Sequence, residues 1–419
     1  MIIATDRALI PSSTASTRHL TVQVQAPAST HQSQRAPVNV ALVLDRSGSM
    51  DGRKIEMARA AVEHAIKLLD ARDHLSLVVY DTEVDVVLES TVATPEAKAL
   101  ALKRLASIGA RGSTDLCAGW SAGADQIERF VTAKDDAGPA RVLLLTDGLA
   151  NHGLIDHDEL ARLAARFRAS GIVTSTFGLG ADFDETLLTR LATEGGGHFY
   201  FIESPRQIPD LLASELGETL DIVAPGAEFV VIGGPDVQIA VLNDFPFEAK
   251  PDGLHVQLGD LVGGQELKLV VALRWQPRPE RAPATASCRL VDRAGKLFPQ
   301  PMLVEWTTVD TETNEAQPVN ASVLVAVAEQ MVARAQARAL EANRKHRLEE
   351  AAEILTRAIA ELRALGTGIA GIDVLIAQLE DDKPQFERVM ETMDAKARHF
   401  VSYNQARGRD SEGKARRRA

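Results

Sequence analysis

Asp45-Arg46-Ser47-Gly48-Ser49-Met50 follows an apolar run, Val38–Leu44, and precedes an amphipathic run that begins near Arg53. The apolar run predicts a β-strand, and the helical spacing of apolar residues after it predicts a helix. In α/β proteins, ligands bind where a strand ends and the chain turns into a helix. One carboxylate and two hydroxyl groups are hard oxygen donors, which suit a hard divalent cation such as magnesium. This stretch therefore predicts a cation site at the edge of a parallel sheet.

Two later segments supply the oxygens that the first loop lacks. Gly112-Ser113-Thr114-Asp115 opens another helical run, and Leu143–Gly148 is an apolar strand that ends on the carboxylate of Asp147. Together the three segments resemble the metal-ion-dependent adhesion site of von Willebrand factor type A (VWA) domains, whose pattern is DxSxS, then Thr, then Asp. The resemblance covers roughly residues 36–220. The matching residues are Asp45, Ser47, Ser49, Thr114 and Asp147.

The resemblance implies both a cofactor and a mode of binding. We expect the site to hold Mg²⁺ or Mn²⁺ in preference to Ca²⁺, and in the family some of the site's residues bind through water. The sixth ligand is typically a carboxylate from a partner protein. The chain resembles bacterial intracellular VWA proteins, which often act with AAA+ ATPases of the MoxR type or with kinase–phosphatase pairs.

Electrostatics explains why such a site needs a cation. If Asp45 and Asp147 approach each other at neighbouring strand ends, their repulsion is roughly 4 kcal/mol at about 4 Å and an effective dielectric constant of about 20. A divalent cation reverses the sign of this interaction. The hydroxyl groups of Ser47, Ser49 and Thr114 complete an oxygen shell without adding charge, so the bound ion keeps an open position for one more anion.

Strands and helices alternate over residues 36–221, which predicts an α/β, Rossmann-like, doubly wound and mainly parallel sheet with helices on both faces. We expect the strand Val142–Leu145 to carry Asp147 and Val84–Leu88 to be an antiparallel edge strand. The remaining elements are expected as strands at 75–80, 172–177 and 198–202 and helices at 95–107, 115–131, 157–169, 184–193 and 206–220.

The segments outside this domain have a different pattern. Residues 222–312 contain short alternating runs separated by turn residues, which predicts a small all-β sandwich. Residues 1–35 form an extension with one alternating strand, Leu20–Val24, which we expect to pair with the later β region. Residues 319–406 predict a helical domain, with helices at 320–342, 346–364, 371–381 and 384–406. The Gly-, Ser- and Arg-rich residues 407–419 predict a disordered basic tail.

Composition narrows the class of function. The formal charge of −12 argues against broad nucleic-acid binding. The two cysteines, Cys117 and Cys288, are far apart, which fits a reducing compartment better than a disulfide framework. We find neither a signal-peptide pattern at the amino terminus nor an apolar run long enough for a transmembrane helix, and we therefore expect a cytoplasmic protein without membrane contact.

Each candidate residue also has a simpler interpretation. Asp45 with its two serines can be a turn that caps the next helix, and Thr114 can cap the helix after it. These interpretations lose weight for the site as a whole, because all three segments occur in the family's order. For His152 we favour a surface loop over a metal ligand, and for Asp115 a helix cap. Cys117 is expected in the core.

The leading hypothesis is a binding protein, not an enzyme, that acts as an adaptor or scaffold. A metal-dependent hydrolase or phosphatase is the first alternative, because a carboxylate–magnesium site also supports phosphoryl transfer. A dehalogenase-like phosphatase needs a second Asp two positions after the first, where this chain has Ser47. The second alternative is a structural scaffold with a vestigial metal site.

Overall fold

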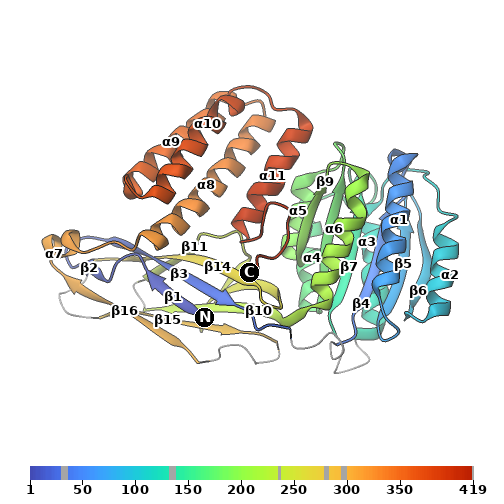
Figure 1. Ribbon diagram of the computed structural model, residues 1–419, viewed down its shortest axis with the longest axis horizontal. Helices are drawn as coiled ribbons and strands as arrows, with labels where there is room; N and C mark the ends of the chain where they lie inside the picture. The colour runs from blue at the N-terminus through green and yellow to red at the C-terminus, as the bar shows by residue number, and fades with distance from the viewer. Residues whose placement is uncertain (30–35, 132–137, 235–236, 278–282, 294–299, 418–419) are drawn as a thin grey trace. The chain divides into compact units, whose positions relative to one another are not determined.

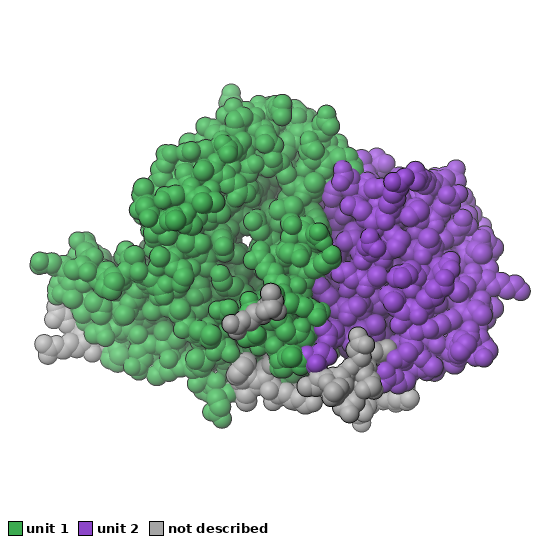
Figure 2. Space-filling model, viewed as in Figure 1, with its two compact units in different colours: residues 1–28, 223–419 green, residues 29–222 purple. Residues whose placement is uncertain are grey.

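The structure, a computed structural model, describes residues 1–29, 36–131, 138–234, 237–277, 283–293 and 300–417. The chain divides into two compact units, residues 29–222 and residues 1–28 with 223–419 (Figures 1 and 2). No helix within these described ranges is long and apolar enough to cross a membrane.

The unit of residues 29–222 is built on one six-stranded sheet with the order β6-β5-β4-β7-β8-β9. Only β6 runs antiparallel, at the edge predicted for it, and the other strands pair in parallel. The strands are β4 (Asn39–Asp45), β5 (His74–Tyr80), β6 (Val84–Val92), β7 (Ala140–Thr146), β8 (Ile172–Leu179) and β9 (Gly196–Ile202).

Every residue of β4 and β7 is buried, which shows that both faces of this sheet are covered by helices. Helix α3 packs across β4, β5 and β7, while α1 lies alongside α6, and α4 alongside α5. A Cβ atom on Gly123 of α3 would lie only 2.3 Å from Cγ2 of Val43, so glycine permits this close helix–sheet contact. The predicted Rossmann-like fold is thereby confirmed. The helices are α1 (Arg53–Leu68), α2 (Pro95–Leu105), α3 (Leu116–Val131), α4 (His157–Ala169), α5 (Glu185–Glu194) and α6 (Ile208–Leu220).

The other unit contains two sheets, with the orders β1-β3-β14-β11 and β12-β13-β10-β15-β16-β2. One apolar core includes buried residues from both, among them Trp275 and Trp306, whose ring centroids lie 4.8 Å apart. The predicted β region is confirmed. Its strands are β10 (Ile222–Gly233), β11 (Val237–Val241), β12 (Phe247–Lys250), β13 (Gly253–Val262), β14 (Glu266–Trp275), β15 (Ala284–Val291) and β16 (Met302–Val309).

The amino-terminal extension belongs to this β region. Strand β3 (Ser16–Gln25) pairs antiparallel with β14 along its whole length, as expected for the strand at Leu20–Val24. The extension holds two further strands that the sequence pattern did not predict, β1 (Ile2–Thr5) and β2 (Leu9–Pro11). Residues 30–35 of the predicted extension lie outside the described residues.

The carboxyl-terminal part is helical, as predicted, with one misplaced boundary. After the short α7 (Thr311–Ala316) come α8 (Ala321–Arg344), α9 (Leu348–Gly366), α10 (Ala370–Phe386) and α11 (Thr392–Ala406). The predicted break at Pro384 is wrong, because α10 continues through Pro384 to Phe386. Pro384 removes one backbone hydrogen bond from the helix, and the burial of Phe386 in the core of the helical part offsets this cost.

The predicted disorder of residues 407–419 is contradicted as far as residue 417. Arg409 pairs with Ala415 and Gln265 with Arg417 in isolated β-bridges. The guanidinium group of Arg407 lies 5.2 Å from the ring centroid of Phe245. The composition of this segment predicted a solvated end, but its arginines pack on an aromatic ring and on a strand edge instead. Residues 418–419 lie outside the described part of the chain.

Candidate metal centre

The parallel register brings the ends of β4 and β7 together. Leu44 of β4 is aligned with Leu145 of β7, so Asp45 and Asp147 follow at the same edge of the sheet. Both side chains are fully buried. Strand β5, the other neighbour of β4, ends at Tyr80 opposite Asp45. Three loops therefore leave the carboxyl edge of the sheet side by side.

The first loop is folded around the carboxylate of Asp45. The backbone N–H of Ser47 donates to Oδ1 at 2.7 Å, and the hydroxyl of Thr146 donates to Oδ2 at 2.5 Å. A single 3-10 turn at Gly48–Met50 then brings the hydroxyl oxygens of Ser47 and Ser49 to 3.1 Å from each other.

The carboxylate of Asp147 faces this loop. The Ser49 hydroxyl donates to its Oδ1 at 2.7 Å, and the ammonium group of Lys54, in the first turn of α1, forms an ion pair with its Oδ2. Lys54 also lies 4.0 Å from Asp182. The sequence analysis did not identify Lys54 as part of the site. Its position in the first turn of the predicted helix, directly after the DxSxS loop, is the signal that could have indicated it.

Thr114 comes from the segment before α3 and is buried. A methyl group built on Gly148 would lie 3.1 Å from Oγ1 of Thr114, 3.6 Å from Oγ of Ser49 and 3.7 Å from Oδ2 of Asp45. Oxygens from three segments of the chain thus converge on one small space that a glycine leaves clear. Carboxylate and hydroxyl oxygens surround this space, and such a set of oxygen ligands fits a small, hard divalent cation.

Burial raises the pKa of Asp45 to about 6, although hydrogen bonds from Thr146 and Ser47 oppose the shift, and the nearby charge of Asp147 raises it further. Desolvation and a neighbouring like charge are the two costs that a bound cation removes. The unfavourable electrostatics of Asp45 and Asp147 therefore point to a cation between them, as does the chemistry of the oxygen ligands.

Two residues beside Thr114 have structural roles. Asp115 accepts a hydrogen bond from the N–H of Ala118 at 3.0 Å, as a helix cap does, and pairs with the exposed His152 at 3.1 Å. The side-chain oxygen of Asn151 accepts from the Ser113 hydroxyl at 2.8 Å and from the Thr114 N–H at 3.2 Å. The structure thus places His152 on an exposed loop, and Asn151 is a link that the sequence did not reveal.

A second group of possible metal ligands lies elsewhere in the same unit. His198, Glu215 and Glu218 bring ligand atoms within 4.8 Å of one another. The carboxylate of Glu215, however, already accepts from Ser175 at 2.5 Å, Tyr200 at 2.7 Å and His198 at 2.9 Å. The guanidinium of Arg141 lies 3.3 Å from it as well. These contacts occupy the carboxylate and indicate a structural ion network that holds α6 against β7, β8 and β9.

Comparison with known proteins agrees with this architecture. The family model of the von Willebrand factor type A domain matches residues 39–214. An uncharacterized protein of Synechocystis sp. is 28% identical over 284 residues, which is 65% of this chain and 65% of that protein. YfbK of Escherichia coli, also uncharacterized, is 25% identical over 60% of this chain and 44% of its own length. This chain therefore spans less than two thirds of either relative.

A human protein and two solved structures extend the comparison. Human inter-alpha-trypsin inhibitor heavy chain H4 is 27% identical over 61% of this chain and 26% of its own length. A von Willebrand factor type A protein from Catenulispora acidiphila shares the fold with a TM-score of 0.72 at 17% identity, covering 96% of both chains. The ArnB paralog VWA2 from Sulfolobus acidocaldarius has a TM-score of 0.57 at 16% identity over 94% of this chain and 97% of its own. Residues 39–214 therefore form a von Willebrand factor type A domain.

Proposed function

We propose that this protein is a metal-dependent protein–protein interaction module. Asp45, Ser47, Ser49, Thr114 and Asp147 hold Mg²⁺ or Mn²⁺, and an acidic side chain of a partner protein completes the coordination of the ion. The observation that carries the proposal is the convergence of Thr114, Ser49 and Asp45 oxygens around Gly148, next to the carboxylate of Asp147.

The balance of charge supports binding of an anion. Two carboxylates neutralise the two charges of the ion, and the hydroxyl groups add none, so the ion retains affinity for one more carboxylate. When bound, the ion supplies the positive charge that attracts the partner's acidic side chain. The protein's own residues hold the ion through their oxygens at the edge of the sheet. Mg²⁺ suits this shell because it needs few carboxylates and tolerates bound water.

A metal-dependent hydrolase or phosphatase is the weaker alternative. Such an enzyme needs a further carboxylate or a general base at the metal. Asp81, at the end of β5, already uses both of its carboxylate oxygens to accept hydrogen bonds from Arg46, Arg111 and the N–H of Glu83. Burial raises the pKa of the Cys117 thiol, which is the opposite of what a nucleophile requires. A scaffold with a vestigial site would not need to keep the complete set of five oxygen ligands.

The setting of this module is a proposal by resemblance. We infer that it acts as an adaptor in a bacterial, cytoplasmic system, with a MoxR-type AAA+ ATPase or a kinase–phosphatase pair as the partner. The free cysteines Cys117 and Cys288 fit a reducing compartment. Residues 36–221 would capture the partner.

The test is affinity capture from native lysate with mass spectrometry, comparing the wild type in magnesium, the wild type in EDTA, and Asp45→Ala. The matched control is Asp51→Ala, which removes an exposed carboxylate six positions later. A partner lost in EDTA and with Asp45→Ala but kept by the control is the expected result. A partner retained under all conditions would assign capture to the other unit and contradict the proposal.

A further inference from the structure

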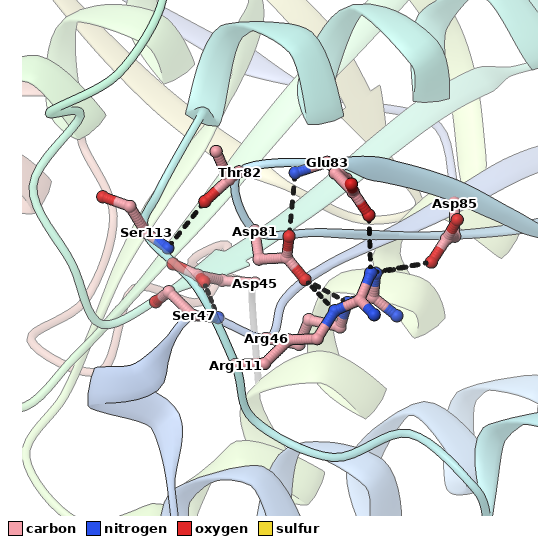
Figure 3. A network of polar contacts seen from close by, with 9 residues as sticks. All are labelled: Asp45, Arg46, Ser47, Asp81, Thr82, Glu83, Asp85, Arg111 and Ser113. Carbon is pink, nitrogen blue, oxygen red and sulfur yellow. Dashed lines mark hydrogen bonds and ion pairs between the residues drawn. The ribbon is translucent and has the colours of Figure 1, made fainter.

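Arg46 lies between two of the candidate metal ligands, Asp45 and Ser47, yet its side chain is directed elsewhere. Its Nε donates to Oδ2 of Asp81 at 2.7 Å, and its Nη2 donates to Oδ2 of Asp85 at 2.5 Å (Figure 3). The Arg46 side chain is only 7% exposed and that of Asp81 only 3%. The first metal loop is therefore anchored to the β5–β6 turn by a buried ion pair.

Asp81 joins this anchor to the loop that carries Thr114. The Nε of Arg111 donates to the same Oδ2 of Asp81 at 2.8 Å, while Oδ1 accepts from the N–H of Glu83. The backbone carbonyl of Asp81 accepts from the N–H of Asp115 at 2.9 Å. Asp81 thus contacts the residues next to Ser47 and next to Thr114 at the same time, and Figure 3 shows both arginines meeting at its carboxylate.

Backbone hydrogen bonds align the same two loops directly. The N–H of Arg111 donates to the carbonyl of Arg46 at 2.7 Å, and the N–H of Gly48 donates to the carbonyl of Gly112 at 3.1 Å. The N–H of Ser113 donates to the hydroxyl of Thr82 at 2.9 Å, which links the second loop to the β5–β6 turn again. The positions of Ser47 and Thr114 relative to each other therefore depend on the side-chain pair of Arg46 and Asp81 together with these backbone hydrogen bonds.

We propose that Arg46 is a positioning residue of the metal centre, which holds the loop of Asp45, Ser47 and Ser49 in register with the loop of Thr114 through its buried pair with Asp81. The proposal rests on the proposed function, because it presumes that a cation binds there. Arg46 itself coordinates nothing. Residues that orient metal ligands from behind commonly change metal affinity about 10- to 100-fold when they are replaced.

The sign of the effect separates positioning from simple electrostatics. Arg46 carries a positive charge beside a cation site, so the removal of that charge alone would strengthen cation binding. Loss of positioning would weaken it. Arg53 provides the matched control, because it is an exposed arginine at the start of α1, just after the same loop, and does not belong to the contacts around Asp81 described above.

The experiment is a titration of the full chain with Mn²⁺, in which the free ion is followed by electron paramagnetic resonance and folding is checked by circular dichroism. We expect Arg46→Gln to weaken Mn²⁺ binding about 10- to 100-fold, and Arg53→Gln to leave it unchanged or slightly stronger. Arg46→Lys keeps the charge but replaces the two donor nitrogens that contact Asp81 and Asp85 by a single ammonium group, so we expect an intermediate loss.

The possible outcomes are distinct. A folded Arg46→Gln protein that binds Mn²⁺ as tightly as the wild type, or more tightly, overturns the positioning role while the metal site stands. If Arg46→Gln does not fold, Arg46→Lys decides: wild-type affinity overturns the proposal, and reduced affinity supports it. A wild type that binds no Mn²⁺, like Asp45→Ala, would overturn the proposed metal site and this inference with it.

Discussion

The hydroxyl of Ser49 donates a hydrogen bond of 2.7 Å to Oδ1 of Asp147, a residue 98 positions later in the chain. This bond closes the candidate metal centre, because it joins the loop after β4 to the loop after β7. Thr114 approaches from a third segment, and Gly148 leaves the space between them free. Access to this space is therefore sensitive to the size of the side chain at position 148.

Gly148→Ala tests whether that space holds the cation. A methyl group at 3.1 Å from Oγ1 of Thr114 is closer than ordinary contact and would displace the hydroxyl. We expect Mn²⁺ affinity to fall about tenfold or more with little change in folding. Isothermal titration calorimetry measures this, and Gly109→Ala, where an added Cβ meets nothing within 4 Å, is the control. Equal affinity in both variants would contradict the location of the site.

Lys54→Met should have the opposite effect on metal binding to Arg46→Gln. Lys54 forms its ion pair directly with the candidate ligand Asp147, so its charge competes with a cation for that carboxylate. We expect the variant to bind Mn²⁺ more tightly, by roughly three- to tenfold, because repulsion between like charges is removed. The same calorimetric titration at low and high salt checks it. Weaker binding would show that Lys54 assists the metal instead.

The fold and the site differ in how far the sequence predicts them. The apolar strands before Asp45 and Asp147 and the DxSxS pattern are local signals, so they predict the parallel sheet and place the candidate ligands at its edge. The pair of Arg46 and Asp81 is not local, because 35 positions separate the two residues and neither belongs to the five-residue pattern. Periodicity carries no information about which charged residues meet across a turn.

Other failures of prediction also have physical causes. The break expected at Pro384 did not occur because Phe386, two positions later, is buried in the core of the helical part, and this packing offsets the hydrogen bond that the proline lacks. The segment 407–417 is ordered because the guanidinium of Arg407 packs on Phe245 and the backbone of Arg417 pairs with that of Gln265 in the β region. Neither contact can be predicted from amino-acid composition, because each joins residues far apart in the sequence.

Gly217→Ala should stabilise α6. Gly217 lies inside the helix, is exposed, and has nothing within 4 Å of an added Cβ. Because alanine loses less backbone entropy than glycine in a helix, we expect a gain of about 0.5–1 kcal/mol in the free energy of unfolding of the unit 29–222. Urea denaturation measures it. A loss of stability would indicate that another segment covers this face of the helix.

The buried carboxylate of Glu215 should make stability depend on pH in acid. Burial alone would raise its pKa, but the nearby charges of His198 and Arg141 and hydrogen bonds from His198 and Ser175 hold the pKa of Glu215 below its usual 4.5. A carboxyl group with a lowered pKa in the folded state contributes stability above its unfolded pKa and loses this contribution as the pH falls through the folded one.

Glu215→Gln isolates this contribution. At pH 7 we expect the variant to be less stable by about 3–5 kcal/mol, since it removes the buried carboxylate that faces the guanidinium of Arg141. Below pH 4.5 the difference from the wild type should shrink, because the carboxyl group is protonated first in the unfolded chain and in the folded protein only at lower pH. Urea denaturation at a series of pH values, followed by hydrogen exchange of the β8 amides, measures this difference in stability. A difference that stays constant with pH would contradict the ionised state of Glu215.

Leu20→Ala tests whether the amino-terminal strand is an integral part of the β region. Leu20 is fully buried in β3, which is hydrogen-bonded to β14 along its length. We expect a loss of about 2–5 kcal/mol, the usual cost of a cavity in a close-packed core. Fluorescence of Trp275 and Trp306 in a Trp120→Phe background follows this unit alone, because Trp120 belongs to the other unit. The control is Ile2→Ala, at 66% exposure on β1, which should change the stability by less than about 0.5 kcal/mol. Equal effects at the two positions would mean that the strand only lies on the surface of the β region. A large effect at Leu20 alone would establish that residues before the VWA domain complete the β-sandwich that follows this domain in the sequence.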